Sequence, residues 1–217
     1  MTGPGGVLDM VRSDLAPAEG GNLLVPLVAA GRLPRERIAW LAAEEYRICR
    51  SDRRSFLHLA ARFPEPPAGD FFVGLAQGET IAAGKLTGLA AALGWSAGDL
   101  ESYQPKPGCQ AYAHYLAWMA LNGGRSDVVI ALVANFAAWG RYCAAVAGGL
   151  RKHYGLGDDA VAFFDFFAEP APGFEQQCLA AVQASAGPGK PPESARRMAR
   201  MVQAYEISFW NTLAEGV

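Results

Sequence analysis

Apolar residues recur along this chain at intervals of three and four, and no stretch of any length alternates between apolar and polar positions. This period is typical of helices that bury one face. It predicts helices over about residues 35–62, 68–93, 111–121, 127–153 and 174–184 and from about residue 194 onward. Short breaks rich in Pro and Gly separate them. We therefore expect an all-α fold, a single-domain bundle of about seven helices.

The domain organisation follows from length and from the Gly and Pro content. A chain of 217 residues with 51% apolar content can bury one sizeable core, and two full domains would be a tight fit. Residues 1–21 are rich in Gly and Pro, so we expect a loose lead-in there and the helical domain over residues 22–217. A Gly- and Pro-rich linker is expected over residues 187–192.

Three polar residues interrupt the apolar stripes of three predicted helices. Counting by three and four places Glu206 with Val202, Phe209 and Leu213 in the last helix. The same count places Glu45 with Ile38, Leu41, Ile48, Phe56 and Leu59 in the first long helix. Asn135 shares a stripe with Val128, Leu132, Trp139 and Val146. Each inward polar group is either satisfied by hydrogen bonds inside the core or placed beside a ligand, and the stripes alone leave both readings open.

Aromatic residues suggest where a ligand would lie. Tyr112 is on the apolar side of the helix over residues 111–121, where its hydroxyl faces either a cavity or the rim of the core. Four phenylalanines fall within residues 163–167. A cluster this dense is typical of a core, and it is also suited to the wall of an aromatic pocket.

Charge and composition exclude several classes of function. The net charge of -2, from 19 basic and 21 acidic residues, gives no field that would attract nucleic acid. No apolar run reaches membrane-spanning length, and the N-terminus lacks the apolar core of a signal peptide, so we expect no membrane partner and a cytoplasmic location. The four cysteines are widely spaced and are expected to be reduced and buried.

The histidines and acids give little basis for a metal or a cofactor. His58, His114 and His153 are the only histidines, and none is part of a Glu-x-x-His pair. The segment 79–90 offers Glu79 as its only carboxylate. A di-iron centre would need several such ligands from facing helices. We therefore expect neither a metal nor a cofactor.

Several short motifs, in this order, resemble the TenA/thiaminase II family. They are Gly31-Arg-Leu-Pro34, Glu44-Glu45-Tyr46, Ala76-Gln77-Gly78, Lys106-Pro107 and Tyr205-Glu206-x-x-Phe209-Trp210, the last being the most specific. The resemblance covers most of the chain after residue 22. It implies the all-helical fold that this family shares with PqqC-like and haem-oxygenase-like proteins.

The resemblance also implies a site that holds an aminopyrimidine. The family's inward acid falls on Glu45, its tyrosine on Tyr112 and its late glutamate on Glu206. The position of its cysteine nucleophile falls on Asn135, and a carboxamide is not a nucleophile, so covalent thiaminase chemistry should be lost. Aromatic residues complete the predicted pocket: Phe136, Trp139, Phe163, Phe167 and Phe209.

Two functional hypotheses follow from the resemblance. In the first, a divergent hydrolase binds an amino-heterocycle with Glu45, Asn135 and Tyr112, and Glu206 activates a water in place of the thiolate. In the second, a catalytically silent relative binds an apolar aromatic ligand or a partner protein in the same place. A third reading, ring closure or oxidation without a cofactor, is disfavoured by the scarcity of histidine. The resemblance further implies a homodimer or homotetramer.

Overall fold

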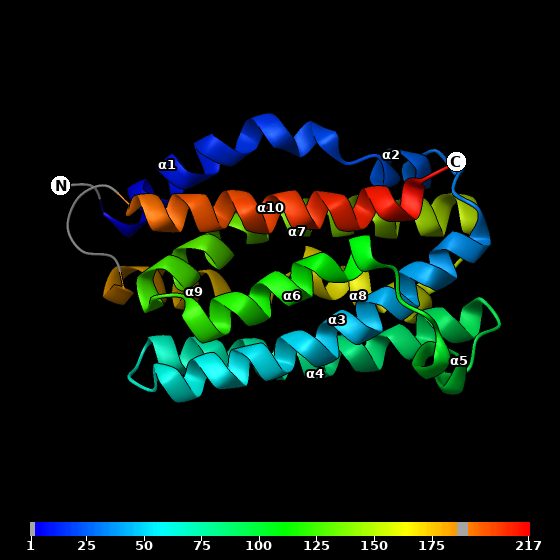
Figure 1. Ribbon diagram of the computed structural model, residues 1–217. Coiled ribbons are helices and arrows are strands. Elements are labelled where there is room, and N and C mark those ends of the chain that lie inside the picture. The colour runs from blue at the N-terminus through cyan, green and yellow to red at the C-terminus, as the bar shows by residue number, and fades with distance from the viewer. Residues whose placement is uncertain (1–2, 186–190) are drawn as a thin grey trace.

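The computed structural model describes residues 3–185 and 191–217, and these residues contain helices and no strands. Figure 1 shows the helices in chain order. They are α1 (Pro4–Leu15), η1 (Ala16–Gly21), α2 (Leu24–Ala29), α3 (Arg35–Arg62), α4 (Ala68–Ala92), α5 (Ala97–Ser102), α6 (Pro107–Asn122), α7 (Arg125–Tyr154), α8 (Asp158–Ala168), α9 (Phe174–Ser185) and α10 (Glu193–Ala214). The all-α prediction is confirmed. The expected count of about seven helices is too low, because the predicted ranges do not include α1, α2, α5 or α8. The predicted linker falls largely on residues 186–190, which lie outside the described residues.

The N-terminal segment differs from the loose lead-in predicted for residues 1–21. In its described part, α1 and the 3-10 helix η1 account for Pro4–Gly21. Pro4 lies in the first turn of α1, a position that needs no backbone donor. The helix forms because one face buries four apolar side chains against α7, α9 and α10: Val7, Leu8, Val11 and Leu15. The Gly and Pro content concealed this stripe.

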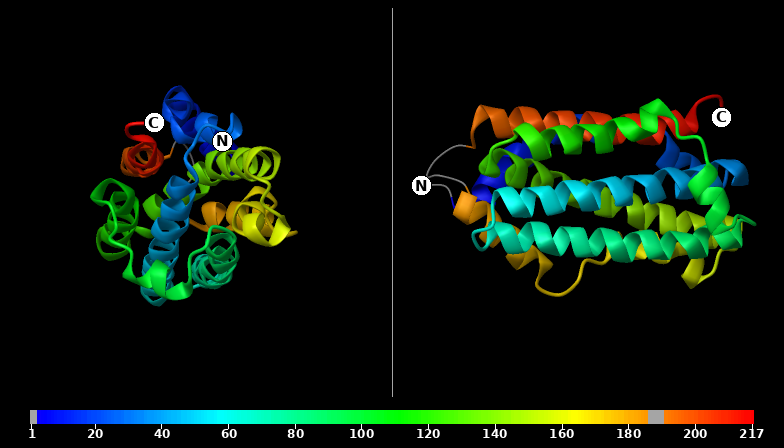
Figure 2. Two further views of the ribbon diagram at one scale, coloured as in Figure 1. Left: turned by 90° about the vertical axis from the view of Figure 1, so that its right-hand side faces the viewer. Right: turned by 60° about the horizontal axis from the view of Figure 1, so that its bottom comes forward.

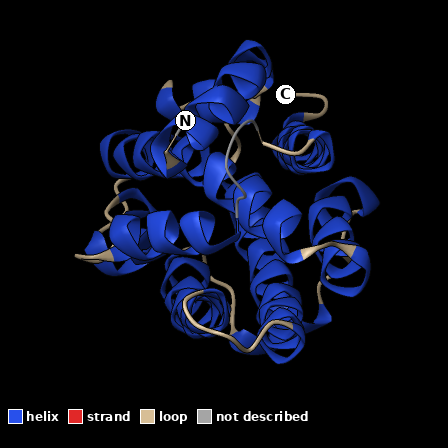
Figure 3. Cartoon of the chain, turned by 90° about the vertical axis from the view of Figure 1, so that its left-hand side faces the viewer, coloured by secondary structure: helices blue, strands red, loops and turns tan. Residues whose placement is uncertain are grey.

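The long helices lie side by side in one bundle. Figure 2 shows α3, α4, α6, α7 and α10 extended along a common direction. The α3 and α4 pair makes the most extensive helix contact in the described chain, and α10 packs on both α6 and α7. Figure 3 looks along the bundle and shows the helices surrounding a shared interior. Residues that face this interior from different helices are therefore brought together at the centre.

Helix α7 contains a long apolar stretch and crosses the interior. Among the described residues it is the one helix long and apolar enough to cross a membrane by length and composition, and 56% of its most apolar window is buried inside the protein. It contacts α1, α2, α8, α9 and α10. Its apolar surface is thus largely covered by the bundle.

The apolar core is divided into two clusters that lie at different levels of the bundle. The first apolar cluster includes Leu41, Leu86, Cys143, Phe163 and Trp210. The second apolar cluster includes Phe72, Leu116, Leu132 and Val202 together with the buried face of α1. The long helices contribute residues to both clusters, so each of them crosses the boundary between the two.

Candidate functional site

A layer of polar side chains separates the two apolar clusters. Along α3 the first cluster ends at Cys49 and the second begins at Phe56, and Asp52 lies between them. The other long helices repeat this change of cluster. We call the five residues at or beside these crossings the polar layer: Asp52 on α3, Glu79 on α4, Tyr112 on α6, Asn135 on α7 and Glu206 on α10.

Three members of the polar layer hold buried atoms that lack hydrogen-bond partners. Asp52, Asn135 and Glu206 are only 3%, 4% and 6% exposed. Asp52 Oδ1, Asn135 Oδ1 and Glu206 Oε1 find no donor among the described residues. An unpaired buried polar atom costs about 1 to 3 kcal/mol, and more if it is charged. Nearby Gln203, by comparison, donates from Nε2 to the carbonyl oxygen of Leu15 at 3.0 Å. Three of the buried unpaired side-chain atoms of the described residues thus belong to the layer, and all three are oxygens that can accept a hydrogen bond.

Glu79 and Tyr112 are the two members of the polar layer that are half-buried and not fully buried. Both lie at the crossing inside the bundle, where burial raises the pKa of each side chain. Tyr112 packs against both apolar clusters. Each nevertheless keeps part of its surface accessible.

The carboxyl groups of the layer are shifted toward their neutral forms. Burial raises the pKa of Glu206 to about 8, and the polar indole N–H of Trp210 nearby lowers the pKa by a smaller amount. Burial also raises the pKa of Glu79 to about 7. The pKa of Asp52 lies well above its usual range because of burial and then the negative charges of Glu79 and Glu45. A carboxyl with a pKa near neutrality can both donate and accept a proton.

Glu45 lies on the same face of α3 as Asp52, two helical turns earlier, and is 3% exposed. Burial, followed by the charges of Glu79 and Glu206, raises the pKa of Glu45 well above its usual range. No Lys or Arg of the described residues forms an ion pair with Glu45, Asp52, Glu79 or Glu206. The site therefore contains four acids and no basic partner from the described chain.

Asn135 uses one end of its amide to bind the bundle. Its Nδ2 donates to the carbonyl oxygen of Ala131 at 2.9 Å and to that of Ala199 on α10 at 3.2 Å. Its Oδ1 is the atom left free. Asn135 can thus offer an acceptor to a ligand and no donor beyond those already used. Cys143, two turns further along α7, is 0% exposed, and burial raises the pKa of its thiol well above the usual range, so it does not replace a thiolate nucleophile.

Aromatic side chains pack beside Glu206 in the first apolar cluster. Trp139 lies 5.3 Å from Trp210 and 5.7 Å from Phe167, measured between ring centroids. Phe163 contacts Phe167 at 5.2 Å, and Phe209 contacts Trp210 at 5.0 Å. The indole Nε1 of Trp210 is itself buried and unpaired. Phe163 is completely buried and belongs to the core, whereas Trp139 and Phe167 keep some accessible surface.

The predicted site residues are only partly brought together. Glu45 and Tyr112 both feel the charge of Glu206. Asn135 bonds to α10 at Ala199, about two helical turns before Glu206. Phe136 does not join the aromatic group of Trp139. It packs instead in the second apolar cluster, 6.4 Å from Phe71 and 5.7 Å from Phe174.

Two acids of the polar layer were not predicted as site residues. Asp52 follows Glu45 by seven residues and precedes Phe56 by four, so it continues the inward stripe of α3. That spacing was the signal that could have identified it. Glu79 lies in a helix so rich in Ala and Gly that its stripe is weak, and only the packing of α4 on α3 assigns it to the interior. The described residues contain no group of three or more His, Cys, Asp or Glu arranged to hold a metal ion.

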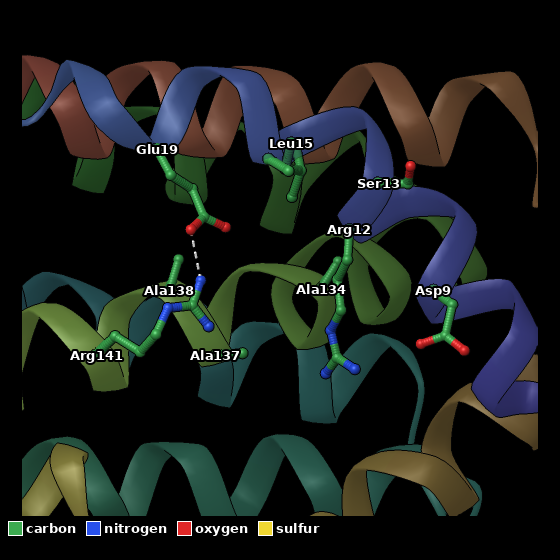
Figure 4. A pocket seen from close by; sticks show the side chains of 10 residues that line it. Asp9, Arg12, Ser13, Leu15, Glu19, Ala134, Ala137, Ala138 and Arg141 are labelled. Atoms are coloured by element: carbon green, nitrogen blue, oxygen red, sulfur yellow. Dashed lines mark hydrogen bonds and ion pairs between the residues drawn. The ribbon is translucent and has the colours of Figure 1, made fainter.

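A surface cleft lies between α1, η1 and α7 (Figure 4). It has a volume of about 330 Å³ and is lined in part by Ala134, which precedes Asn135, and by Ala138, three residues after it. The Arg141 Nη2 to Glu19 Oε2 ion pair, at 2.6 Å, bridges α7 and η1 across it. The negative charge of Glu19 contributes to the raised pKa of Glu206.

A second cleft, with a volume of about 470 Å³, is lined by residues of α10 and the C-terminal turn together with Leu23. Neither Glu45 nor Glu206 contributes to its wall. It is thus separate from the polar layer, and none of the unpaired atoms of the layer opens into it.

The comparisons with known proteins agree with this architecture. A family model described as "TENA/THI-4/PQQC family" matches residues 24–216. A TenA homologue from P. horikoshii OT3 is similar in structure with a TM-score of 0.77 at 16% identity, over 100% of each chain. A TenA homolog from Pseudomonas syringae pv. tomato str. DC3000 gives 0.78 at 14% identity, over 95% of this chain and 92% of the other. A domain with a heme oxygenase-like fold from Shewanella denitrificans OS217 gives 0.78 at 13% identity, over 95% and 90%. No curated protein matches the sequence.

Proposed function

Because the chain belongs to the TENA/THI-4/PQQC family, we propose that its polar layer binds a small amino-heterocycle of the aminopyrimidine class. Glu45, Asn135 and Glu206 would accept hydrogen bonds from the amino groups of the ligand, and Tyr112 would orient its ring. The observation that carries this proposal is the set of unpaired acceptors on Asp52, Asn135 and Glu206.

The free groups of the layer select the chemistry of the ligand. Carboxylates and an amide oxygen accept hydrogen bonds, so the complementary molecule is rich in N–H donors and carries positive charge when protonated. Trp139 and Phe167, which keep accessible surface, offer faces on which a flat ring can stack. An amino-heterocycle has both properties, whereas an anionic ligand would face four acids.

The proposed reaction is hydrolysis of an exocyclic carbon–nitrogen bond through water. Glu206, with a pKa raised to about 8 by burial, would take a proton from the attacking water and return a proton to the leaving amine. One C–O bond forms, one C–N bond breaks, and the amine departs as ammonia. A water nucleophile is required because neither Asn135 nor the buried Cys143 can supply a thiolate.

Binding without turnover is the second candidate function. It is favoured by Asn135, whose amide nitrogen is held by two backbone carbonyls where the resemblance places a cysteine nucleophile. In this reading the polar layer and the aromatic group beside it hold a ligand and perform no chemistry.

A calorimetric titration with 4-amino-5-aminomethyl-2-methylpyrimidine tests the proposal. We expect the wild-type protein to bind it and Glu206→Gln to bind it about tenfold more weakly or worse, since a charge-assisted hydrogen bond is lost. Glu36→Gln, an exposed acid in the first turn of α3, is the matched control and should bind like wild type. Release of ammonia then separates hydrolysis from silent binding. If the wild-type protein does not bind this compound, the proposed function is wrong.

A further inference from the structure

We propose that the cleft between α1, η1 and α7 binds a small organic acid, with Arg12 holding its carboxylate and the alanines of α7 lying under its apolar part. None of the five residues of the polar layer lines this cleft. The ligand has the opposite charge to the one proposed for the layer. This second site therefore goes beyond the proposed function and does not depend on it.

Arg12 is a half-buried cation without a partner in the described part of the chain. It extends from α1 into the cleft (Figure 4), its Nε is buried and unpaired, and it belongs to none of the ion pairs. A guanidinium cannot become neutral by losing a proton in a protein. The charge of Arg12 must therefore be balanced by water or by an anion from outside the chain.

Arg12 differs in this respect from arginines of similar burial. The other half-buried arginines of the described residues all donate hydrogen bonds within the chain: Arg37, Arg47, Arg125 and Arg196. Asp14 follows Arg12 by two residues, but both of its carboxylate oxygens already accept from Arg196, at 2.6 and 2.8 Å. The donors of Arg12 are thus left for a ligand.

The charges around the cleft favour an anion with one negative charge. Arg12 and Arg141 line it together with Asp9 and Glu19, so the formal charges of the wall sum to zero. Arg141 and Glu19 neutralise each other through their ion pair at 2.6 Å. A carboxylate adds one charge to this wall and pairs with a planar guanidinium through two parallel hydrogen bonds. A phosphate dianion would add two charges beside Asp9, which opposes both.

Small side chains of α7 leave space for the rest of the ligand. Ala134, Ala137 and Ala138 precede Arg141 on one face of the helix, at intervals of three and four residues (Figure 4). Their methyl groups and Leu15 give the wall an apolar part. The volume of about 330 Å³ lies at the lower end of small-molecule sites, which run from about 300 to 1,000 Å³. A ring or a short chain with one carboxylate fits these features.

Calorimetric titration with benzoate tests this site, and benzamide is the neutral compound of the same shape. We expect benzoate to bind the wild-type protein at least about tenfold more tightly than benzamide, because only benzoate forms a charge-assisted pair with the guanidinium. Arg12→Gln should remove this difference. Arg54→Gln, which deletes an exposed arginine outside the cleft, is the matched control and should keep it.

Asp9→Asn is a second variant whose expected effect cannot come from loss of the fold. Asp9 is an exposed acid on the wall of the cleft, so its charge opposes a bound carboxylate. Removing this charge should tighten the binding of benzoate by about two- to fivefold at low salt, the range of a single surface charge interaction. The binding of benzamide should not change.

Several results would overturn this inference while leaving the proposed function in place, because the aminopyrimidine is titrated separately. Equal binding of benzoate and benzamide, or binding of neither, would do so. A preference for benzoate that survives in Arg12→Gln would place the carboxylate elsewhere. Tighter binding of inorganic phosphate than of benzoate would contradict the selection of a carboxylate. Glu206→Gln should bind benzoate like wild type, and a loss of binding there would place benzoate in the polar layer.

Discussion

Glu44 and Glu45 are adjacent in α3, yet only the carboxylate of Glu44 is hydrogen-bonded to the bundle. Its Oε1 accepts from the Tyr103 hydroxyl at 3.0 Å and from the Lys106 backbone N–H at 2.7 Å, and its Oε2 accepts from Gln110 Nε2. These bonds tie α3 to the start of α6. Glu45 is 3% exposed and makes no hydrogen bond to any described residue. Glu44 is thus a structural acid, and Glu45 is free for a ligand.

This contrast predicts opposite effects of the same substitution. Glu44→Gln weakens three bonds to a buried carboxylate and should lower the free energy of unfolding by about 2 to 4 kcal/mol. Glu45→Gln removes an unpaired buried acid and should leave the free energy of unfolding unchanged or raise it by about 1 kcal/mol. Urea unfolding at pH 7 measures both. A large loss of stability in Glu45→Gln would show that its carboxylate has a structural partner.

The raised pKa values of the polar layer predict that stability falls as pH rises. Glu206 and Glu79 have folded-state pKa values of about 8 and about 7, above the unfolded value of about 4.3 for glutamate. Between these limits the folded protein holds protons that the unfolded chain has released. The contribution of each group to the free energy of unfolding should therefore be fully present below about pH 4.5. It should be lost progressively up to about pH 8, by up to about 1.4 kcal/mol per pH unit for each group.

Asp14 sets the acid limit of this window. The hydrogen bond from Arg196 holds the pKa of Asp14 below its usual range, so the stability it contributes is present above about pH 4 and is lost as pH falls. We expect the urea midpoint of the ligand-free protein to be higher at pH 5.5 than at pH 8.5. Glu206→Gln should flatten this dependence, and Glu36→Gln should not. A midpoint that rises toward pH 8.5 would contradict the neutral forms assigned to the layer.

Much of this site could be predicted because helical period places residues on faces without knowledge of their neighbours. Glu45, Asn135 and Glu206 follow from counting along single helices, and all three are buried. Asp52 satisfies the same count along α3. In α3, α7 and α10 the sequence period was therefore a useful guide to polar groups that face the interior, whereas in α4 it did not identify Glu79.

Properties that depend on contacts between helices could not be predicted in this way. The division of the core into two apolar clusters arises from how five helices align, and no single stripe contains that information. Phe136 is adjacent to Asn135 in sequence, but the 100° step between neighbouring helical residues turns it toward Phe71 and Phe174. The stripe of α1 was hidden because Gly and Pro weaken an isolated helix, whereas packing against α7 and α10 stabilises it.

The cysteines provide a test of burial that is independent of ligand binding. Cys49, Cys109, Cys143 and Cys178 are at most 5% exposed, and burial raises the pKa of each thiol. Thiolates should therefore be scarce and inaccessible in the folded protein. We expect 5,5′-dithiobis(2-nitrobenzoic acid) at pH 8 to leave all four unmodified over minutes and to modify all four after unfolding in guanidinium chloride. Rapid modification of Cys143 in the native protein would contradict its burial, and Cys143 would then be a candidate nucleophile on α7.

Two neighbouring glycines of α7 test how closely α2 packs on this helix. A Cβ atom at Gly149 would lie 2.7 Å from the carbonyl oxygen of Val28 and 3.1 Å from the Cα of Ala29, whereas a Cβ at Gly148 would have no atom within 4 Å. Gly149→Ala should therefore lower the free energy of unfolding by about 2 to 3 kcal/mol, because backbone must move to admit the methyl group. Gly148→Ala should raise it by about 0.5 to 1 kcal/mol, because alanine favours the helix. Urea unfolding of the two variants side by side decides the matter, since both add one methyl group to the same turn. Equal effects would mean that α2 does not lie against α7 as described, and the N-terminal wall of the bundle would have to be reassigned.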